Sequence, residues 1–287
     1  MRDITRDNIT AAVIASFGGA HDERFRLIVS RLVHHLHEFS RETALTHEEW
    51  RAGIDFLYRA GKISDDGRNE FVLISDVLGL SSLVDLLQTS AGATDHSALG
   101  PFHAAGSPAL PVGGDLVRNN AGEPVLIRGR VLDDAGAPVS GATLDFWQAA
   151  ANGLYWQQDP TQETHNLRCT MTTGVDGRYA FTTVRPGPYT VPYDGPVGDL
   201  LRAGGRHAWR PAHFHFIVAA AGHLPLTTEL FCAGDEYLEQ DAVFGVRTGL
   251  VLELKKTGSA EDARGLERNL EPPFYRVEFD FRLKRDA

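Results

Sequence analysis

The sequence predicts an α+β fold in which a helical N-terminal part precedes a mostly antiparallel β-sandwich. Helical spacing of apolar residues dominates roughly the first hundred positions, whereas short alternating segments rich in proline and glycine follow Gly100-Pro101. The chain has 287 residues, which is enough for a sizeable core. We therefore expect two domains, residues 1–100 and residues 101–287.

The helical part starts with a stripe of apolar residues from Phe25 to Phe39, spaced three or four positions apart. Thr46 and Glu49 have the spacing of a capping box, which predicts a second helix that ends at Gly61. The remaining predicted elements are two short helices over 70–78 and 81–87, and strands over 125–132, 142–148, 179–184, 212–219, 226–232 and 274–283.

Composition and charge exclude several classes of protein. The 38 Asp and Glu outnumber the 28 Lys and Arg, and a net charge of −10 argues against a nucleic-acid binder. Cys169 and Cys232 are too few for a disulfide framework and favour a reducing compartment. The apolar run over 11–20 is shorter than the roughly 20 residues that span a bilayer, and Asp3 and Asp7 are atypical of a secretory leader. We expect a cytoplasmic protein without membrane insertion.

The strongest local signal for chemistry is the pair His213 and His215. In a strand, residues two apart project from one face, so these imidazoles point together while Phe214 and Phe216 face an apolar layer. Two imidazoles on one face form half of a metal site, and two buried structural histidines are the alternative.

Several completions of such a metal site are open from the residues alone. A zinc or Fe(II) hydrolase or oxygenase needs a carboxylate, for which Glu229 is the nearby candidate. Tyr155 and Tyr189 offer phenolate oxygens that suit Fe(III), although each singly can be a packed aromatic. Two phenolates and two neutral imidazoles leave a ferric centre with one net positive charge. The turns at 133–138 and 175–177 are also typical of transthyretin-like modules that bind without catalysis.

Four segments together closely resemble the intradiol ring-cleavage dioxygenases: residues 144–159, 166–189, 194–196 and 205–215. The resemblance implies one non-haem Fe(III) per chain, bound by Tyr155, Tyr189, His213 and His215. The helical N-terminal part resembles the catechol branch of this family. It therefore implies a homodimer through these helices and a bound phospholipid between them.

Within that branch the chain is most similar to the hydroxyquinol 1,2-dioxygenases, with Asp76 in a matching segment. The implied reaction is intradiol cleavage of hydroxyquinol (benzene-1,2,4-triol) by O2 to 3-hydroxy-cis,cis-muconate, the enol form of maleylacetate. Catechol or chlorocatechol 1,2-dioxygenase is the alternative. The resemblance also implies a substrate pocket, formed by Leu73, Asp76, Leu99, Gly100, Val191, Pro192, Glu229 and Val243.

The resemblance also implies roles for three further side chains. Tyr189 would leave the metal and act as a base, while Tyr155 would stay bound. Arg210 would stabilise charge that develops on the ring, and a buried structural ion pair is its alternative role. Glu229 departs from the family pattern, which usually has Gln or His there, and we expect it to change the charge balance and to pair with Arg210.

Overall fold

The computed structural model describes residues 3–65 and 68–286 of the chain, which form two compact units. The first unit is residues 1–59 and the second is residues 60–287. This division lies some forty residues before the predicted one, because the helices between residues 60 and 88 belong to the same unit as the sandwich. The assignment of residues 1–100 to association and 101–287 to catalysis stays a prediction.

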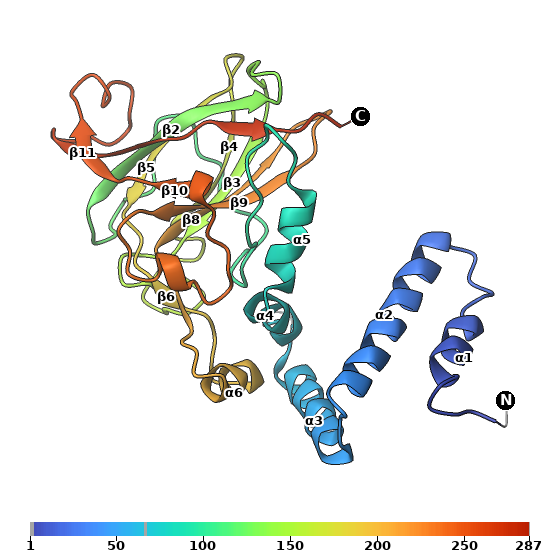
Figure 1. The fold of residues 1–287 in the computed structure, drawn as a ribbon. Helices are drawn as coiled ribbons and strands as arrows, with labels where there is room; N and C mark the ends of the chain where they lie inside the picture. Colours follow the sequence, from blue (N-terminus) through green and yellow to red (C-terminus); the bar gives the residue numbers. More distant parts are fainter. Residues whose placement is uncertain (1–2, 66–67, 287) are drawn as a thin grey trace. The chain divides into compact units, whose positions relative to one another are not determined.

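Three helices begin in the first unit: α1 (Ile9–Ser16), α2 (Glu23–Glu42) and α3 (His47–Ile63) (Figure 1). The predicted capping box at α3 is confirmed, since the Thr46 amide donates to Glu49 Oε2 (2.9 Å) and the Glu49 amide donates to Thr46 Oγ1 (3.2 Å). The predicted end of this helix is wrong by two residues, because Gly61 keeps a helical backbone. Helix α1 was not predicted, since its eight residues have no amphipathic pattern.

The predicted apolar stripe lies on α2 and remains substantially exposed in the described chain. Val29 is half-buried, and exposed fractions of 50–55% are found for the larger side chains of the stripe: Phe25, Ile28, Leu32, Leu36 and Phe39. On α3, Trp50 and Ile54 are also exposed, with exposed fractions of 54% and 50%. None of the described helices combines the length and hydropathy that crossing a lipid bilayer requires.

Among the described residues of the second unit there are three α-helices: α4 (Glu70–Val77), α5 (Leu80–Gln88) and α6 (Pro196–Ala203). Helices α4 and α5 confirm the prediction, and Gly79 separates them with a left-handed backbone (φ +74°). Helix α6 was missed, because Gly195 followed by Pro196 is typical of a turn as well as of a helix start. The buried Glu70 accepts the Val197 amide (3.1 Å), which joins α4 to the first turn of α6.

The described strands form two sheets and a short ribbon (Figure 1). The first sheet has the order β1 (Gly114–Asp115), β5 (Arg178–Val184), β2 (Pro124–Asp133), β12 (Phe274–Glu278) and β11 (Lys255–Gly258), with β13 (Phe281–Leu283) also paired to β2. The second has the order β10 (Val251–Leu252), β9 (Leu226–Cys232), β8 (His213–Ala219), β3 (Thr143–Gln148) and β4 (Arg168–Thr172). The ribbon pairs β6 (Tyr189–Thr190) with β7 (Trp209–Arg210).

The main core lies between the two sheets, as expected for a sandwich. Phe146 of β3 packs edge-on against Phe181 of β5, with ring centroids 4.6 Å apart. Phe216 of β8 packs on Phe281 of β13 at 4.9 Å. All four rings are at most 1% exposed. The predicted α+β fold with a β-sandwich is confirmed.

The last predicted strand, 274–283, is in fact two strands, β12 and β13, that pair in parallel with β2 in succession. The ladder is interrupted where the Asp280 side chain accepts the Arg130 amide (2.8 Å). The Phe279 carbonyl also lies so close to Gly129 that a Cβ there would be 1.7 Å from its oxygen. The sequence pattern does not reveal this break, because the side chains before and after it alternate between the same two faces of the sheet.

Candidate metal centre and active site

His213 and His215 lie on β8, between β3 and β9 in the second sheet. Both imidazoles are buried, with exposed fractions of 2% and 1%, and they face away from the core between the sheets. Phe214 and Phe216 project to the opposite face and belong to that core. The period-two prediction for this strand is confirmed, and it brings the two imidazoles together.

Hydrogen bonding fixes which nitrogen of His213 is available to a metal. Its Nδ1 lies 2.6 Å from the carbonyl of Pro211, and a carbonyl can only accept, so Nδ1 carries the proton. The neutral imidazole therefore presents a bare Nε2, which lies 3.0 Å from Nε2 of His215. Burial lowers the pKa of both histidines, so both rings are neutral at neutral pH, as metal ligands must be.

Two tyrosines approach the same point from other elements. Tyr155, in the loop after β3, places its Oη 3.2 Å from Nε2 of His215. Tyr189, on the ribbon strand β6, has its ring at right angles to that of Tyr155, with centroids 5.2 Å apart. Its buried hydroxyl makes no hydrogen bond of standard geometry among residues 3–65 and 68–286, although Arg210 and Tyr155 lie close enough to influence its pKa. A buried orphan hydroxyl is costly, and a bond to a metal would satisfy it.

Aromatic stacking and one glycine hold this group of four donors in place. Trp147 stacks on the His215 ring with centroids 4.7 Å apart and an interplanar angle of 7°. Phe102 stacks on Tyr155 at 4.4 Å. Gly100 has a left-handed φ of +72°, and a Cβ there would lie 3.1 Å from Cε1 of His215. The close approach of this backbone therefore requires glycine.

A buried ion cluster lies beside the two histidines. Arg210 donates from Nη1 and Nη2 to both oxygens of Glu229 (2.5 and 2.9 Å), which confirms the predicted pair. Its Nε and Nη2 donate to both oxygens of Asp241 (3.0 and 3.1 Å). Ser97 Oγ donates to Glu229 Oε2 (2.7 Å). Gly245 leaves room for the cluster, since a Cβ there would lie 2.7 Å from Arg210 Nη2.

Glu229 also faces both imidazoles. Two alternative sets of metal ligands therefore include the histidines, one completed by Glu229 and the other by Tyr155 and Tyr189. Its Oε1 lies 3.3 Å from His213 Nε2 and 3.4 Å from His215 Nδ1, the latter without hydrogen-bond geometry. These three residues have the spacing of a metal-binding group within the described chain. However, Arg210 and Ser97 already occupy the Glu229 oxygens, whereas the Tyr189 hydroxyl is unpartnered. The set with two tyrosines therefore fits a metal better.

The predicted substrate pocket is brought together in part. Leu73, Val191 and Val243 are each at most 3% exposed and belong to one apolar cluster. Asp76 is 5% exposed on α4, and burial raises the pKa of its carboxyl. Leu99 is 45% exposed and lies outside this cluster. Pro192 is half-buried.

Sequence reasoning missed several residues that support the site. Asp241 was given no role from the sequence, because it lies outside the four segments that carry the resemblance. Ser97 carried none, because it is 132 positions from Glu229. Trp147 lies on the face of β3 opposite the core residues Leu144 and Phe146, and the sequence gives no sign that its ring stacks on His215.

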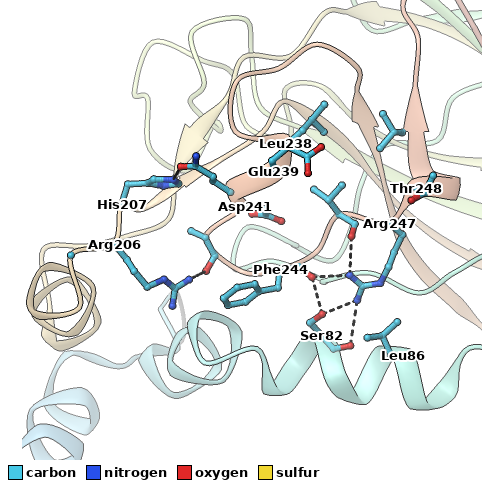
Figure 2. Close-up of a pocket in the computed structure, with 15 residues that line it drawn as sticks. Ser82, Leu86, Arg206, His207, Leu238, Glu239, Asp241, Phe244, Arg247 and Thr248 are labelled. Atoms are coloured by element: carbon cyan, nitrogen blue, oxygen red, sulfur yellow. Dashed lines mark hydrogen bonds between the residues drawn. The ribbon is translucent and has the colours of Figure 1, made fainter.

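The loop that carries Asp241 borders a cavity of about 850 Å³ (Figure 2). Arg247 donates to the carbonyl of Phe244 (2.8 Å), and Arg206 donates to that of Ala242 (2.8 Å). The Arg206 guanidinium also lies 4.8 Å from the centre of the Phe244 ring. These contacts fix the loop, and with it the carboxylate that holds Arg210.

Comparison with known proteins agrees with this geometry. A family model described as "Dioxygenase" matches residues 107–285, and one described as "Catechol dioxygenase N terminus" matches residues 22–96. The chain belongs to the intradiol dioxygenase family. It is 43% identical over 286 residues to a 6-chlorohydroxyquinol 1,2-dioxygenase of Cupriavidus pinatubonensis, covering 99% of each chain. It is 42% identical to a hydroxyquinol 1,2-dioxygenase of a Rhizobium species, covering 95% of this chain and 93% of that one.

Solved structures of intradiol dioxygenases show the same fold. The crystal structure of a hydroxyquinol 1,2-dioxygenase from Pseudomonas putida superposes with a TM-score of 0.87 at 40% identity, covering 98% of this chain and 99% of that one. A catechol 1,2-dioxygenase from Pseudomonas arvilla superposes at 0.78 and 33% identity, covering 97% and 92%. The predicted family is confirmed, and the transthyretin-like binding module is excluded as the family of this chain.

Proposed function

We propose that this intradiol dioxygenase cleaves hydroxyquinol with O2 between its two adjacent hydroxylated carbons, giving 3-hydroxy-cis,cis-muconate. One non-haem Fe(III) per chain would be held by Tyr155, Tyr189, His213 and His215. The observation that carries this proposal is the orphaned Tyr189 hydroxyl, buried beside the phenol of Tyr155 and two neutral imidazoles. The relatives named hydroxyquinol 1,2-dioxygenases support the choice of substrate.

A ferric ion bound there would act as a Lewis acid toward the adjacent oxygens of the substrate. Tyr189 would supply the base: held as a phenolate by the metal, its oxygen could take a proton from a substrate hydroxyl and so become the neutral phenol. Tyr155 is held by the stacked Phe102 ring and keeps its place. The packed side chains around these donors exclude water from the reacting oxygens.

Arg210 contributes to the reaction chiefly by position. Four of its five N–H groups donate hydrogen bonds to Glu229 and Asp241. The fifth, on Nη1, is directed at Nε2 of His213 at 3.4 Å. When that nitrogen binds a metal it cannot accept, so this N–H is free to meet an oxygen of the substrate.

Asp76 provides the specificity for a triol. It lies on α4 in the same turn as Leu73, whose side chain belongs to an apolar cluster with Val191 and Val243. A ring against this cluster would direct its third hydroxyl at the Asp76 carboxyl, and a hydrogen bond to a charged group contributes about 1.5–3 kcal/mol. Catechol lacks that hydroxyl and would leave the carboxyl without its partner.

The rate comparison that tests this function uses hydroxyquinol, catechol and chlorocatechols with the iron-loaded protein. We expect O2 uptake with each ring-cleavage product identified by mass, and the highest kcat/KM for hydroxyquinol. A higher kcat/KM for catechol or a chlorocatechol would identify that compound as the preferred substrate instead. Absence of O2 uptake with every diol and triol would contradict the proposed function as a whole.

We also propose that the chain is a cytoplasmic homodimer that associates through the apolar faces of α2 and α3 and holds a phospholipid there. The support is the row of large apolar side chains on these helices, each about half exposed. Light scattering tests the dimer, and a monomer at micromolar concentration would contradict it. Mass spectrometry of an organic extract tests the lipid, and an extract without phospholipid would contradict that part.

A further inference from the structure

The ion cluster beside the histidines carries a net negative charge. Arg210 contributes one positive charge, while Glu229 and Asp241 contribute one negative charge each. Both carboxylates accept paired hydrogen bonds from the guanidinium, which is the geometry of ionised groups. Within the described chain, Arg210 is the sole arginine or lysine paired with either carboxylate. One negative charge is therefore left without a counter-charge.

This excess charge is fully buried and faces the candidate metal site. Glu229 is 0% exposed and Arg210 is 1% exposed. Glu229 Oε1 lies 3.3 Å from His213 Nε2 and 3.4 Å from His215 Nδ1, so the negative charge borders both imidazoles. A buried charge without compensation destabilises the folded protein. A cation bound by the two histidines would be the nearest available compensation.

We propose that Glu229 sets the charge of the metal ion that the site prefers, acting through electrostatics and not as a ligand. The inference rests on the proposed Fe(III) site. Two phenolates from Tyr155 and Tyr189, added to the excess charge of the cluster, give a total of minus three. The buried Arg168 and Asp76 also act electrostatically on this site, and their opposite charges leave the sum unchanged when both are ionised. That total matches a trivalent ion. A neutral side chain at position 229 would leave a total charge of minus two, which matches a divalent ion.

Glu229 is suited to this role because hydrogen bonds from two side chains hold its carboxylate in place. Arg210 holds both of its oxygens, and Ser97 Oγ holds Oε2 at 2.7 Å. Its charge is thus fixed beside the histidines whether or not a metal is bound. The carboxylate therefore favours Fe(III) over Fe(II), and trivalent over divalent ions in general, without changing the ligands.

The matched variants are Glu229→Gln, which removes the charge with nearly the same shape, and Ser97→Ala, which removes a hydrogen bond to Glu229 but keeps the charge. The reduction potential of the iron-loaded proteins is measured by spectroelectrochemical titration. We expect Glu229→Gln to weaken the preference for Fe(III) over Fe(II) at least tenfold, a rise of about 59 mV for one electron. Ser97→Ala is expected to stay within about a third of that shift.

A second readout uses no iron and no turnover. Metal-free protein is titrated with Ga(III), a redox-inert trivalent ion, and separately with Zn(II), and binding is followed by the rise in Tm. We expect the ratio of Ga(III) to Zn(II) affinity to fall at least tenfold in Glu229→Gln. The metal-free variant is also expected to have a higher Tm than the metal-free wild type, because the uncompensated charge is gone.

Asp241→Asn removes the other negative charge of the cluster and provides the test if Glu229→Gln does not fold. We expect the same direction of change in both readouts. Equal potentials and equal metal ratios in wild type and variant, with visible tyrosinate absorption in both, would overturn the inference and leave the proposed function intact. A wild-type protein that binds no Fe(III) would overturn both.

Discussion

Gly100 is the residue at which a single methyl group would enter the proposed metal site. Its backbone has φ +72°, and an added Cβ would lie 3.1 Å from His215 Cε1, 3.5 Å from His215 Nε2 and 4.0 Å from Tyr189 Oη. Gly141 has the same φ of +72°, but nothing lies within 4 Å of its added Cβ. The variants Gly100→Ala and Gly141→Ala therefore share the backbone strain and differ in the contact with His215.

The strain and the contact have separate magnitudes. A left-handed alanine costs about 1–2 kcal/mol, which lowers Tm by roughly 2–8 °C at about 2–4 °C per kcal/mol for a domain of this size. Carbon atoms pack at about 3.5–4.0 Å, so the contact at Gly100 displaces the His215 ring by roughly 0.4 Å or more. Metal–ligand distances tolerate about 0.2 Å. We therefore expect iron affinity to fall at least tenfold, about 1.4 kcal/mol, in Gly100→Ala alone.

The assay measures bound iron per chain in both variants after incubation with a graded series of chelator concentrations, together with Tm by circular dichroism. We expect similar losses of Tm and a loss of iron that is confined to Gly100→Ala. If Gly100→Ala retained iron as Gly141→Ala does, the metal would not lie at His215 Nε2. An equal loss of iron from both variants would show that backbone strain, and not contact with His215, causes the loss.

Three further predictions concern the stacking, the pH dependence and the substrate. Trp147→Phe removes buried contact with His215 and is expected to lower the free energy of unfolding in urea by about 1–3 kcal/mol; an unchanged midpoint would contradict the packing. Burial raises the pKa of Asp85 to about 6, above its unfolded value of 3.8, so its stabilising contribution is complete below about pH 4 and is lost as the pH rises through 6. In urea unfolding, Asp85→Asn should therefore be more stable than wild type by about 1 kcal/mol at pH 7.5, a value reduced to allow for solvent screening of a half-buried group. At pH 4 the two proteins should have equal stability. Equal stability at both pH values would refute this prediction. Asp76→Ala is expected to lower kcat/KM for hydroxyquinol about tenfold or more while catechol changes less than about threefold; equal losses on both would remove its role in specificity.

The sequence predicted those elements whose side chains repeat with one clear period. Helix α2 and strand β8 are such cases, because apolar side chains recur along each with a single period. Helix α6 was missed because Pro196 at its start is equally compatible with a turn. The break between β12 and β13 was missed because it depends on a side chain, Asp280, that replaces a backbone hydrogen bond of the ladder.

The site was predictable to different degrees. The pairing of His213 with His215 followed from strand geometry alone, because two positions define one face. Tyr155 and Tyr189 were assigned by family resemblance, since nothing local distinguishes a ligand phenol from a packed one. The contact of Ser97 with Glu229 could not be predicted, because it depends on how the chain folds over a separation of 132 positions.

The central claim is that two tyrosines and two histidines hold a ferric ion, and the visible absorption of the iron-loaded protein tests it most directly. We predict a reddish protein with about one iron per chain and a tyrosinate-to-iron absorption band, and a weaker, shifted band in Tyr189→Phe with the circular dichroism unchanged. A folded wild-type protein that binds iron without this band, or a band that Tyr189→Phe leaves unaltered, would contradict the claim.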